Sequence, residues 1–69
     1  MDENLIKQFG HKVRKYRMKR GFSQEELADR AGLHRTQIVL IESGKRCPRL
    51  DTIYKLALAL DVEPWRLLT

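Results

Sequence analysis

The chain has 69 residues, 42% hydrophobic and 33% charged, a balance typical of one globular domain rather than of a disordered segment. Its formal net charge of +5 favours an anionic partner, with nucleic acid ahead of an acidic membrane surface. The longest apolar run, Leu56 to Leu60, falls far short of the ~20 residues of a membrane span, and the acidic N-terminus lacks the order of a secretory signal. The only cysteine, Cys47, excludes an internal disulfide and fits a reducing compartment. We therefore expect a single cytoplasmic domain over residues 1–69.

Helical periodicity dominates the first part of the chain. Leu5, Phe9, Val13 and Tyr16 recur at steps of four, four and three, which places them on one helix face, and Gly21 is expected to end this helix. The other face is basic, and such a face is more typical of a solvated surface than of a DNA contact. Its cations are Lys7, Lys12, Arg14, Lys15, Lys19 and Arg20.

A second helix is predicted by the run Ser23-Gln24-Glu25-Glu26, which has the pattern of a capping box. The Ser23 hydroxyl is expected to accept from the amide of Glu26, while the Glu26 carboxylate reaches back to the amide of Ser23. The helix should run from about residue 24 to residue 30 and stop at Ala31-Gly32.

Three further helices are expected. The third should run from about residue 34 to residue 43, with Ile38 and Ile41 facing inward and Gly44 at its end. A basic loop, residues 45–49, follows it, and Asp51 is a candidate cap for the fourth helix. The inward stripe of that helix is Ile53, Leu56, Ala57 and Leu60. Pro64 suits the first turn of a short fifth helix over residues 65–68. The sequence therefore predicts an all-α domain of five short helices without strands.

The second and third helices, joined through Ala31-Gly32-Leu33, have the size and turn of a helix-turn-helix. Matching positions cover nearly the whole chain and closely resemble the Cro/cI-type helix-turn-helix family, also called the XRE family. They are Gly21 to Ala28, Ala31-Gly32-Leu33, Ile38, Ile41-Glu42, Gly44, Pro48, Leu56 to Leu60, Val62 and Leu67-Leu68. The resemblance implies a five-helix, lambda-repressor-like domain with its third helix in the major groove. It also implies a transcriptional regulator that binds a palindromic operator in double-stranded DNA as a homodimer.

The same resemblance assigns residues to the DNA. Those expected to face the bases are Arg35, Thr36, Gln37, Val39 and Leu40, with Gln37 at the edge and better suited to a phosphate. Those expected to bind phosphates are Gln24, Lys45 and Arg46. The Arg35 guanidinium can pair with both major-groove acceptors of guanine, and Thr36 offers a hydroxyl and a methyl group. Val39 and Leu40 are apolar where many relatives have polar residues, which shifts hydrogen-bonded recognition onto Arg35 and Thr36.

Two further groups are assigned by the resemblance. Arg17 and Glu42 match positions whose side chains pair internally and tie the first helix to the end of the third. In many relatives the C-terminal region forms the dimer contact. The candidates here are Tyr54, Leu58, Trp65 and Leu68, although Trp65 and Leu68 fit a plain core equally well. His34 stands where the family commonly has a stronger helix cap.

Other classes of function are weaker. The chain has no catalytic carboxylate pair, triad or zinc spacing, so we expect no enzyme, cofactor, metal or small-molecule ligand. The main rival is a protein-interaction module that binds a partner, such as a toxin, through Val39 and Leu40. Among single-domain members, residues 32–36 look like those of restriction–modification controller proteins, with phage Cro-like repressors and antitoxins as alternatives.

Overall fold

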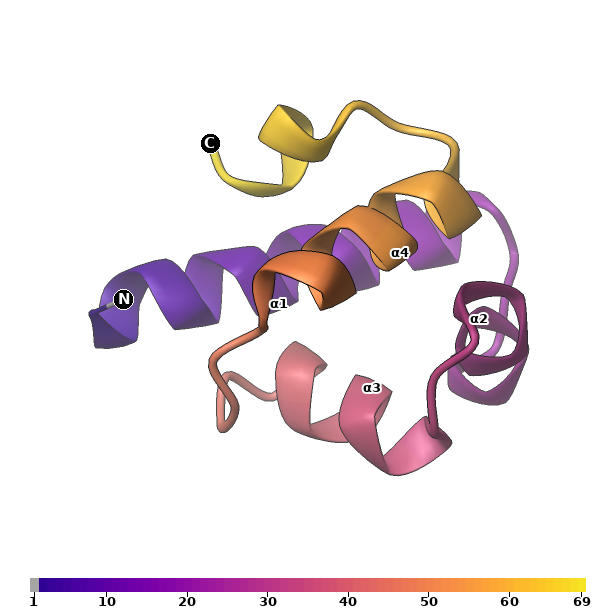
Figure 1. Cartoon of the computed structure of the whole chain (residues 1–69), viewed down its shortest axis with the longest axis horizontal. Coiled ribbons are helices and arrows are strands. Elements are labelled where there is room, and N and C mark those ends of the chain that lie inside the picture. Colours follow the sequence, from indigo (N-terminus) through magenta and orange to yellow (C-terminus); the bar gives the residue numbers. More distant parts are fainter. Residues whose placement is uncertain (1) are drawn as a thin grey trace.

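The computed structural model describes residues 2–69. This part of the chain contains four α-helices and one short 3-10 turn, joined by loops (Figure 1). The helices are α1 at Glu3–Lys19, α2 at Gln24–Ala31, α3 at Arg35–Glu42 and α4 at Leu50–Leu60, and the 3-10 turn η1 spans Pro64–Leu67. The strongest packing joins α3 to both α1 and α2, while α4 packs on α2 and η1 closes over α4 and α1. The helix-turn-helix pair α2–α3 therefore rests on α1 and α4.

One hydrophobic core joins all five elements, because each contributes at least one fully buried apolar side chain. The predicted inward stripes of the third and fourth helices are buried, and so are Phe9 and Val13 of the first stripe. Leu5, the first member of that stripe, is instead exposed. The largest fully buried side chains are Phe9, Val13, Leu27, Ile38, Ile41, Leu56, Leu60 and Leu67.

Helix α1 approaches α3 at Gly10, a position that the periodicity of the sequence did not single out. A Cβ atom at residue 10 would meet the carbonyl oxygens of Ile41 and Glu42 at the end of α3. Those oxygens belong to the last turn of α3 and to backbone that cannot rotate away as a flexible side chain would. Because residue 10 carries no side chain, the backbones of α1 and α3 can pack closely at this point.

The predicted fifth helix is wrong, since residues 64–67 form a single 3-10 turn. Its amides bond three residues back, from Arg66 to the carbonyl of Glu63 at 3.0 Å and from Leu68 to that of Trp65 at 3.0 Å. Pro64 supplies no amide hydrogen, and a segment this short cannot build a run of α-helical bonds. The fold has four α-helices, and buried Leu67 anchors η1 to the core.

Two predicted caps also differ from the structure. At α2, the Ser23 hydroxyl accepts from the Glu26 amide at 3.0 Å, but the Glu26 carboxylate accepts from Arg30 at 3.1 Å instead of reaching back. The guanidinium one turn along the helix offers a stronger, charged donor than the Ser23 amide. At α4, Arg49 is the cap residue, and Asp51 lies inside the first turn, 3.4 Å from Arg49 Nε. The helix begins earlier because the Ile53 amide already bonds to the Arg49 carbonyl at 3.0 Å.

Replacing Gly10 with alanine tests the close approach of the two helices. We expect Gly10→Ala to lower the free energy of unfolding by about 1–3 kcal/mol, because the added methyl group must push α3 away from α1. Thermal unfolding followed by circular dichroism measures the effect. Gln8→Ala, at an exposed position of the same helix, is the control. Equal melting temperatures for Gly10→Ala and the wild type would show that the two helices are not held this closely.

Candidate nucleic-acid interface

The outer face of α3 carries most of the residues that the sequence assigns to the bases. Arg35 and Thr36 are exposed, Val39 is 39% exposed, and Leu40 and Gln37 are half-buried. Ile38 and Ile41, on the inner face, are fully buried, and this fixes which side of the helix points outward. The exposed side chains thus form one short row with a forked cation at its N-terminal end.

Gln37 has a local role that the sequence analysis missed. Its side-chain oxygen accepts from the backbone amide of His34 at 3.0 Å, which closes the start of α3. His34 is the cap residue, and the spacing His34–Gln37 is that of a capping box with glutamine at its third position. The spacing of these two residues in the sequence could have predicted this capping role of Gln37. The hydrogen bond uses the oxygen of Gln37 and leaves its amide group as a donor.

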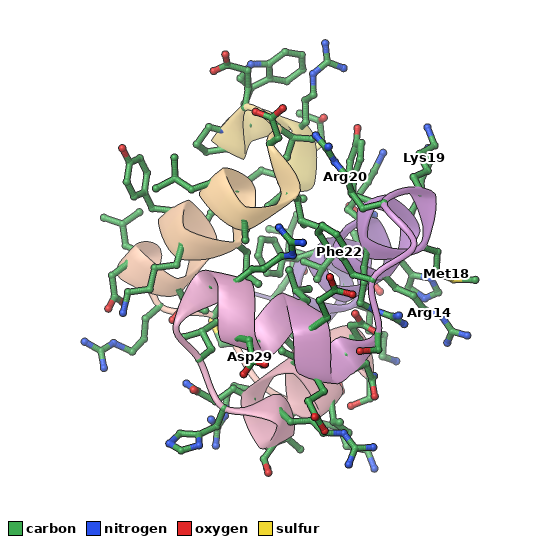
Figure 2. The ribbon with its side chains drawn as sticks, turned by 90° about the vertical axis from the view of Figure 1, so that its right-hand side faces the viewer. Arg14, Met18, Lys19, Arg20, Phe22 and Asp29 are labelled. Atoms are coloured by element: carbon green, nitrogen blue, oxygen red, sulfur yellow. The ribbon has the colours of Figure 1, made fainter. Side chains whose placement is uncertain are left out.

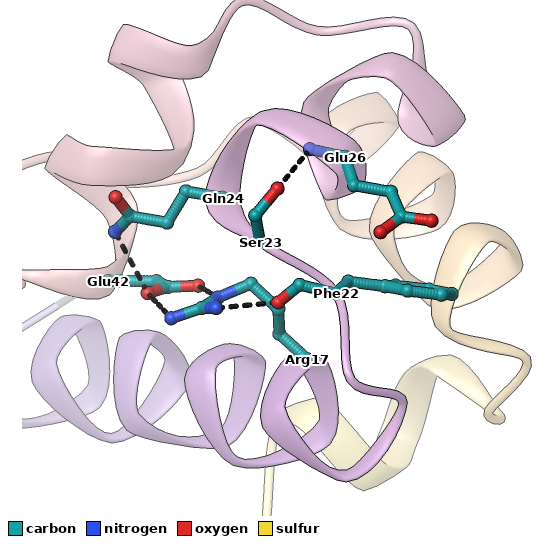
Figure 3. A network of polar contacts seen from close by, with 6 residues as sticks. All are labelled: Arg17, Phe22, Ser23, Gln24, Glu26 and Glu42. Carbon is teal, nitrogen blue, oxygen red and sulfur yellow. Dashed lines mark hydrogen bonds and ion pairs between the residues drawn. The ribbon is translucent and has the colours of Figure 1, made fainter.

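Arg17 and Glu42 meet in a bidentate ion pair beneath the row (Figure 3). Arg17 Nε donates to one Glu42 oxygen at 2.7 Å and Nη2 donates to the other at 3.1 Å. The third nitrogen of the fork, Nη1, donates to the Phe22 carbonyl at 2.7 Å. The two side chains are only 13% and 4% exposed. The pair therefore joins α1, the turn before α2 and the end of α3 through three hydrogen bonds of one guanidinium.

Gln24 belongs to the same network. Its side-chain amide donates to Glu42 at 3.1 Å, so the residue assigned to a phosphate also bonds inside the protein (Figure 3). A surface hollow lies beside it, lined by Arg17, Ser23, Gln24, Glu25 and Arg35. The first turn of α2 opens into this hollow, where backbone amides favour an anion, although the Glu25 carboxylate opposes one. The amide of Gln24 retains a second hydrogen for an external acceptor.

The loop after α3 adds exposed cations at the opposite end of the row. Lys45 and Arg46 are exposed and have no carboxylate within ion-pair distance among the described residues. Arg49 is also exposed and points from the cap of α4, with a 3.4 Å contact to Asp51. The sequence analysis placed Arg49 in a basic loop but did not assign it to the interface. These cations lie beyond the C-terminal end of the row on α3, and Arg35 lies at its N-terminal end.

The candidate dimer residues lie on a separate surface formed by α4 and η1. Tyr54, Leu58, Trp65 and Leu68 are all exposed, so neither Trp65 nor Leu68 is a plain core residue. An apolar depression beside them is lined by Leu50, Ile53, Tyr54, Pro64 and Leu68. The Arg66 guanidinium lies 4.8 Å from the centre of the Trp65 ring and covers part of it. The sequence analysis missed Leu50, the most exposed large apolar side chain of the described residues.

Between Asp2 and Thr69, no group of three or more His, Cys, Asp or Glu side chains is arranged to hold a metal ion. Over the same residues, no helix combines the length and the apolar character that crossing a bilayer requires.

Comparisons with known proteins agree with this geometry. A family model described as helix-turn-helix matches residues 13–64. The chain is 48% identical over 69 residues to the control protein C.BamHI of Bacillus amyloliquefaciens, covering 99% of this chain and 85% of the relative. The crystal structure of the restriction–modification controller protein C.AhdI from Aeromonas hydrophila superposes with a TM-score of 0.87 at 44% identity, covering 93% of this chain and 96% of that one. The biofilm regulator SinR, solved in complex with DNA, superposes with a TM-score of 0.85 at 31% identity, covering 88% and 98%.

A double-mutant cycle tests the ion pair beneath the reading face. Arg17→Met or Glu42→Gln alone should lower the free energy of unfolding by about 3–5 kcal/mol, because each leaves a buried charge without its partner. The double variant should recover part of that loss. Urea unfolding of the four proteins gives the coupling energy, and a value near zero would show that the two side chains do not meet in solution.

Proposed function

The chain belongs to the Cro/cI-type (XRE) helix-turn-helix family of transcriptional regulators, and from this premise we propose that it binds a short palindromic site in duplex DNA as a homodimer. Each subunit inserts α3 into the major groove of one half-site. The protein is then a cytoplasmic regulator of a nearby promoter, of the type of the restriction–modification controllers that it resembles.

The outward face of α3 is the observation that carries this proposal. Arg35 stands exposed at the first position of the helix, with no carboxylate in ion-pair distance among the described residues. An uncommitted guanidinium can donate two hydrogen bonds to one guanine, whereas Thr36 and Val39 offer a hydroxyl and methyl groups to neighbouring bases. Specificity in this proposal therefore rests on a small set of contacts, of which Arg35 is the strongest.

Affinity comes mainly from the phosphate backbone in this proposal. Gln24 and the first turn of α2 bind one strand, and Lys45 and Arg46 bind the other beyond the end of α3. Each cation that neutralises a phosphate releases condensed counterions, so the affinity falls as the salt concentration rises. The rival function, capture of a partner protein through Val39 and Leu40, predicts a weaker dependence on salt, and the half-burial of Leu40 does not favour it.

The proposal of a homodimer rests on the apolar surface of α4 and η1. One reading helix offers too few contacts to select a site among the competing sequences of a genome, and a second copy doubles them. Tyr54, Leu58, Trp65 and Leu68 are all exposed, and Tyr54 lines one surface hollow with Leu58 and another with Leu68. Exposed apolar side chains gathered in this way are typical of a surface that another protein covers. The two reading helices would then lie about 34–36 Å apart, one turn of the duplex.

Selection of bound sequences from a random duplex library tests the function directly. We expect the wild type to recover a palindrome with a guanine at a fixed place in each half-site. Arg35→Ala should weaken specific binding by about 1–3 kcal/mol and relax the preference at that one base pair, since two hydrogen bonds to guanine are lost.

Lys45→Ala and Arg46→Ala serve as the matched controls. Each removes one positive charge, as Arg35→Ala does, but each should weaken specific and random duplexes alike and lower the salt slope by about one unit. An Arg35→Ala variant that loses affinity equally on all sequences would make Arg35 a phosphate contact. Recovery of no shared sequence by the wild type would contradict the proposed function.

A charge placed in the apolar patch tests the dimer. Leu68→Glu should weaken self-association in sedimentation experiments while leaving the helical content unchanged, because two like charges would face each other across the seam. DNA binding should then depend more steeply on protein concentration, with the same preference within each half-site. Met18→Glu, on an exposed apolar residue of α1, is the control for sedimentation. An unchanged monomer–dimer equilibrium in Leu68→Glu would place the seam elsewhere.

A further inference from the structure

The basic face of α1 consists of two flanks with different surroundings. Lys7, His11 and Arg14 recur at steps of four and three, so they lie on one side of the helix. Lys12 and Lys19, seven residues apart, follow the opposite side. In Figure 2, which looks at α1 from its C-terminal end, Arg14 and Met18 project outward from the right and lower right of the helix, whereas Lys19 projects from its upper side. Only the first flank borders the reading helix.

The first flank is fixed against the end of α3. A surface hollow is lined jointly by Lys7 and His11 of α1 and by Glu42, Ser43 and Gly44 at the end of α3. Gly44 has a φ of 73°, and a Cβ atom there would lie 2.8 Å from Cγ of Lys7. The aliphatic stem of Lys7 therefore rests on the chain just before Lys45.

The charge of this flank is not cancelled inside the protein. Lys7 and Arg14 are exposed and have no carboxylate within ion-pair distance among the described residues. Glu42, the acidic residue of the hollow, is 4% exposed and already paired with Arg17. The surface beside α3 is therefore cationic, whereas Lys19 on the other flank lies 5.7 Å from the centre of the Tyr16 ring.

We propose that Lys7, His11 and Arg14 form a phosphate track that binds one strand of the operator alongside the groove occupied by α3. This rests on the proposed function and extends its contact surface to α1. From residue 7 to residue 14 the helix rises about 10 Å. Successive phosphates of one strand are about 3.4 Å apart along the duplex axis but further apart along the winding strand, so three side chains spread over this rise can meet at most about three of them. It continues the line of Arg17 and Gln24, which border the neighbouring hollow.

Two double variants with the same change of charge test the track. Lys7→Gln/Arg14→Gln removes two positive charges from the proposed track, and Lys12→Gln/Lys19→Gln removes two from the opposite flank. Glutamine keeps the aliphatic stem of residue 7 over Gly44. Binding of each protein to the selected duplex is measured across a range of salt concentrations, and hydroxyl-radical footprints are recorded. Thermal melting of the free proteins shows that both variants fold.

The track variant should lower the salt slope by about two units relative to the wild type, with an unchanged base preference. It should also lose protection of the strand beside α3, at about three successive sugars. The control variant should keep the slope and the footprint nearly unchanged. Equal losses in the two variants would mean that α1 acts only through its long-range field, and would overturn the track alone. A wild type that binds no duplex would overturn the proposed function and the track together.

Discussion

The ion pair between Arg17 and Glu42 fixes the position of α3 against α1. Three donors of the guanidinium are used, two on Glu42 and one on the Phe22 carbonyl, and Gln24 donates a third hydrogen bond to the Glu42 carboxylate. These residues come from α1, from the turn before α2, from α2 and from α3. Because the pair is nearly excluded from solvent, removal of either partner would leave a poorly solvated charge where α1, α2 and α3 meet. The position of the exposed side chains on the outer face of α3 thus depends on the Arg17–Glu42 pair, which lies on the inner side of that helix.

Gly10 complements the ion pair at the same junction. The ion pair holds the side chains at the C-terminal half of α1, and the missing side chain at Gly10 lets the backbone of α3 approach about two turns earlier in α1. Together they hold the C-terminal end of α3, at Ile41 and Glu42, against α1.

Much of the fold follows from the sequence, because apolar spacing determines which faces are buried. Ile38 and Ile41, and the stripe from Ile53 to Leu60, lie where their periodicity places them. Local chemistry was less predictable where two partners compete. Glu26 turns to Arg30, and the segment after Pro64 is too short to be more than a 3-10 turn. Within the site, family positions indicated the outer face of α3, but neither the close approach at Gly10 nor the contact of Lys7 with Gly44 leaves a periodic signal. Both depend on which helices meet, and that is a property of the tertiary packing.

In the proposed complex with DNA, the balance between base contacts and phosphate contacts follows from the side chains of this surface. α3 presents one forked cation, one hydroxyl and two apolar side chains, so hydrogen bonds to bases are few. Cations without an acidic partner instead surround the helix, from Arg14 and Lys7 on α1 to Lys45 and Arg46 after α3. Phosphate contacts act on every sequence alike, and they add affinity without discrimination. A surface of this kind gains selectivity when a second subunit repeats its few base contacts. The preference of the dimer for its site is then the product of the preferences of the two half-sites, and each subunit still needs only a few base contacts.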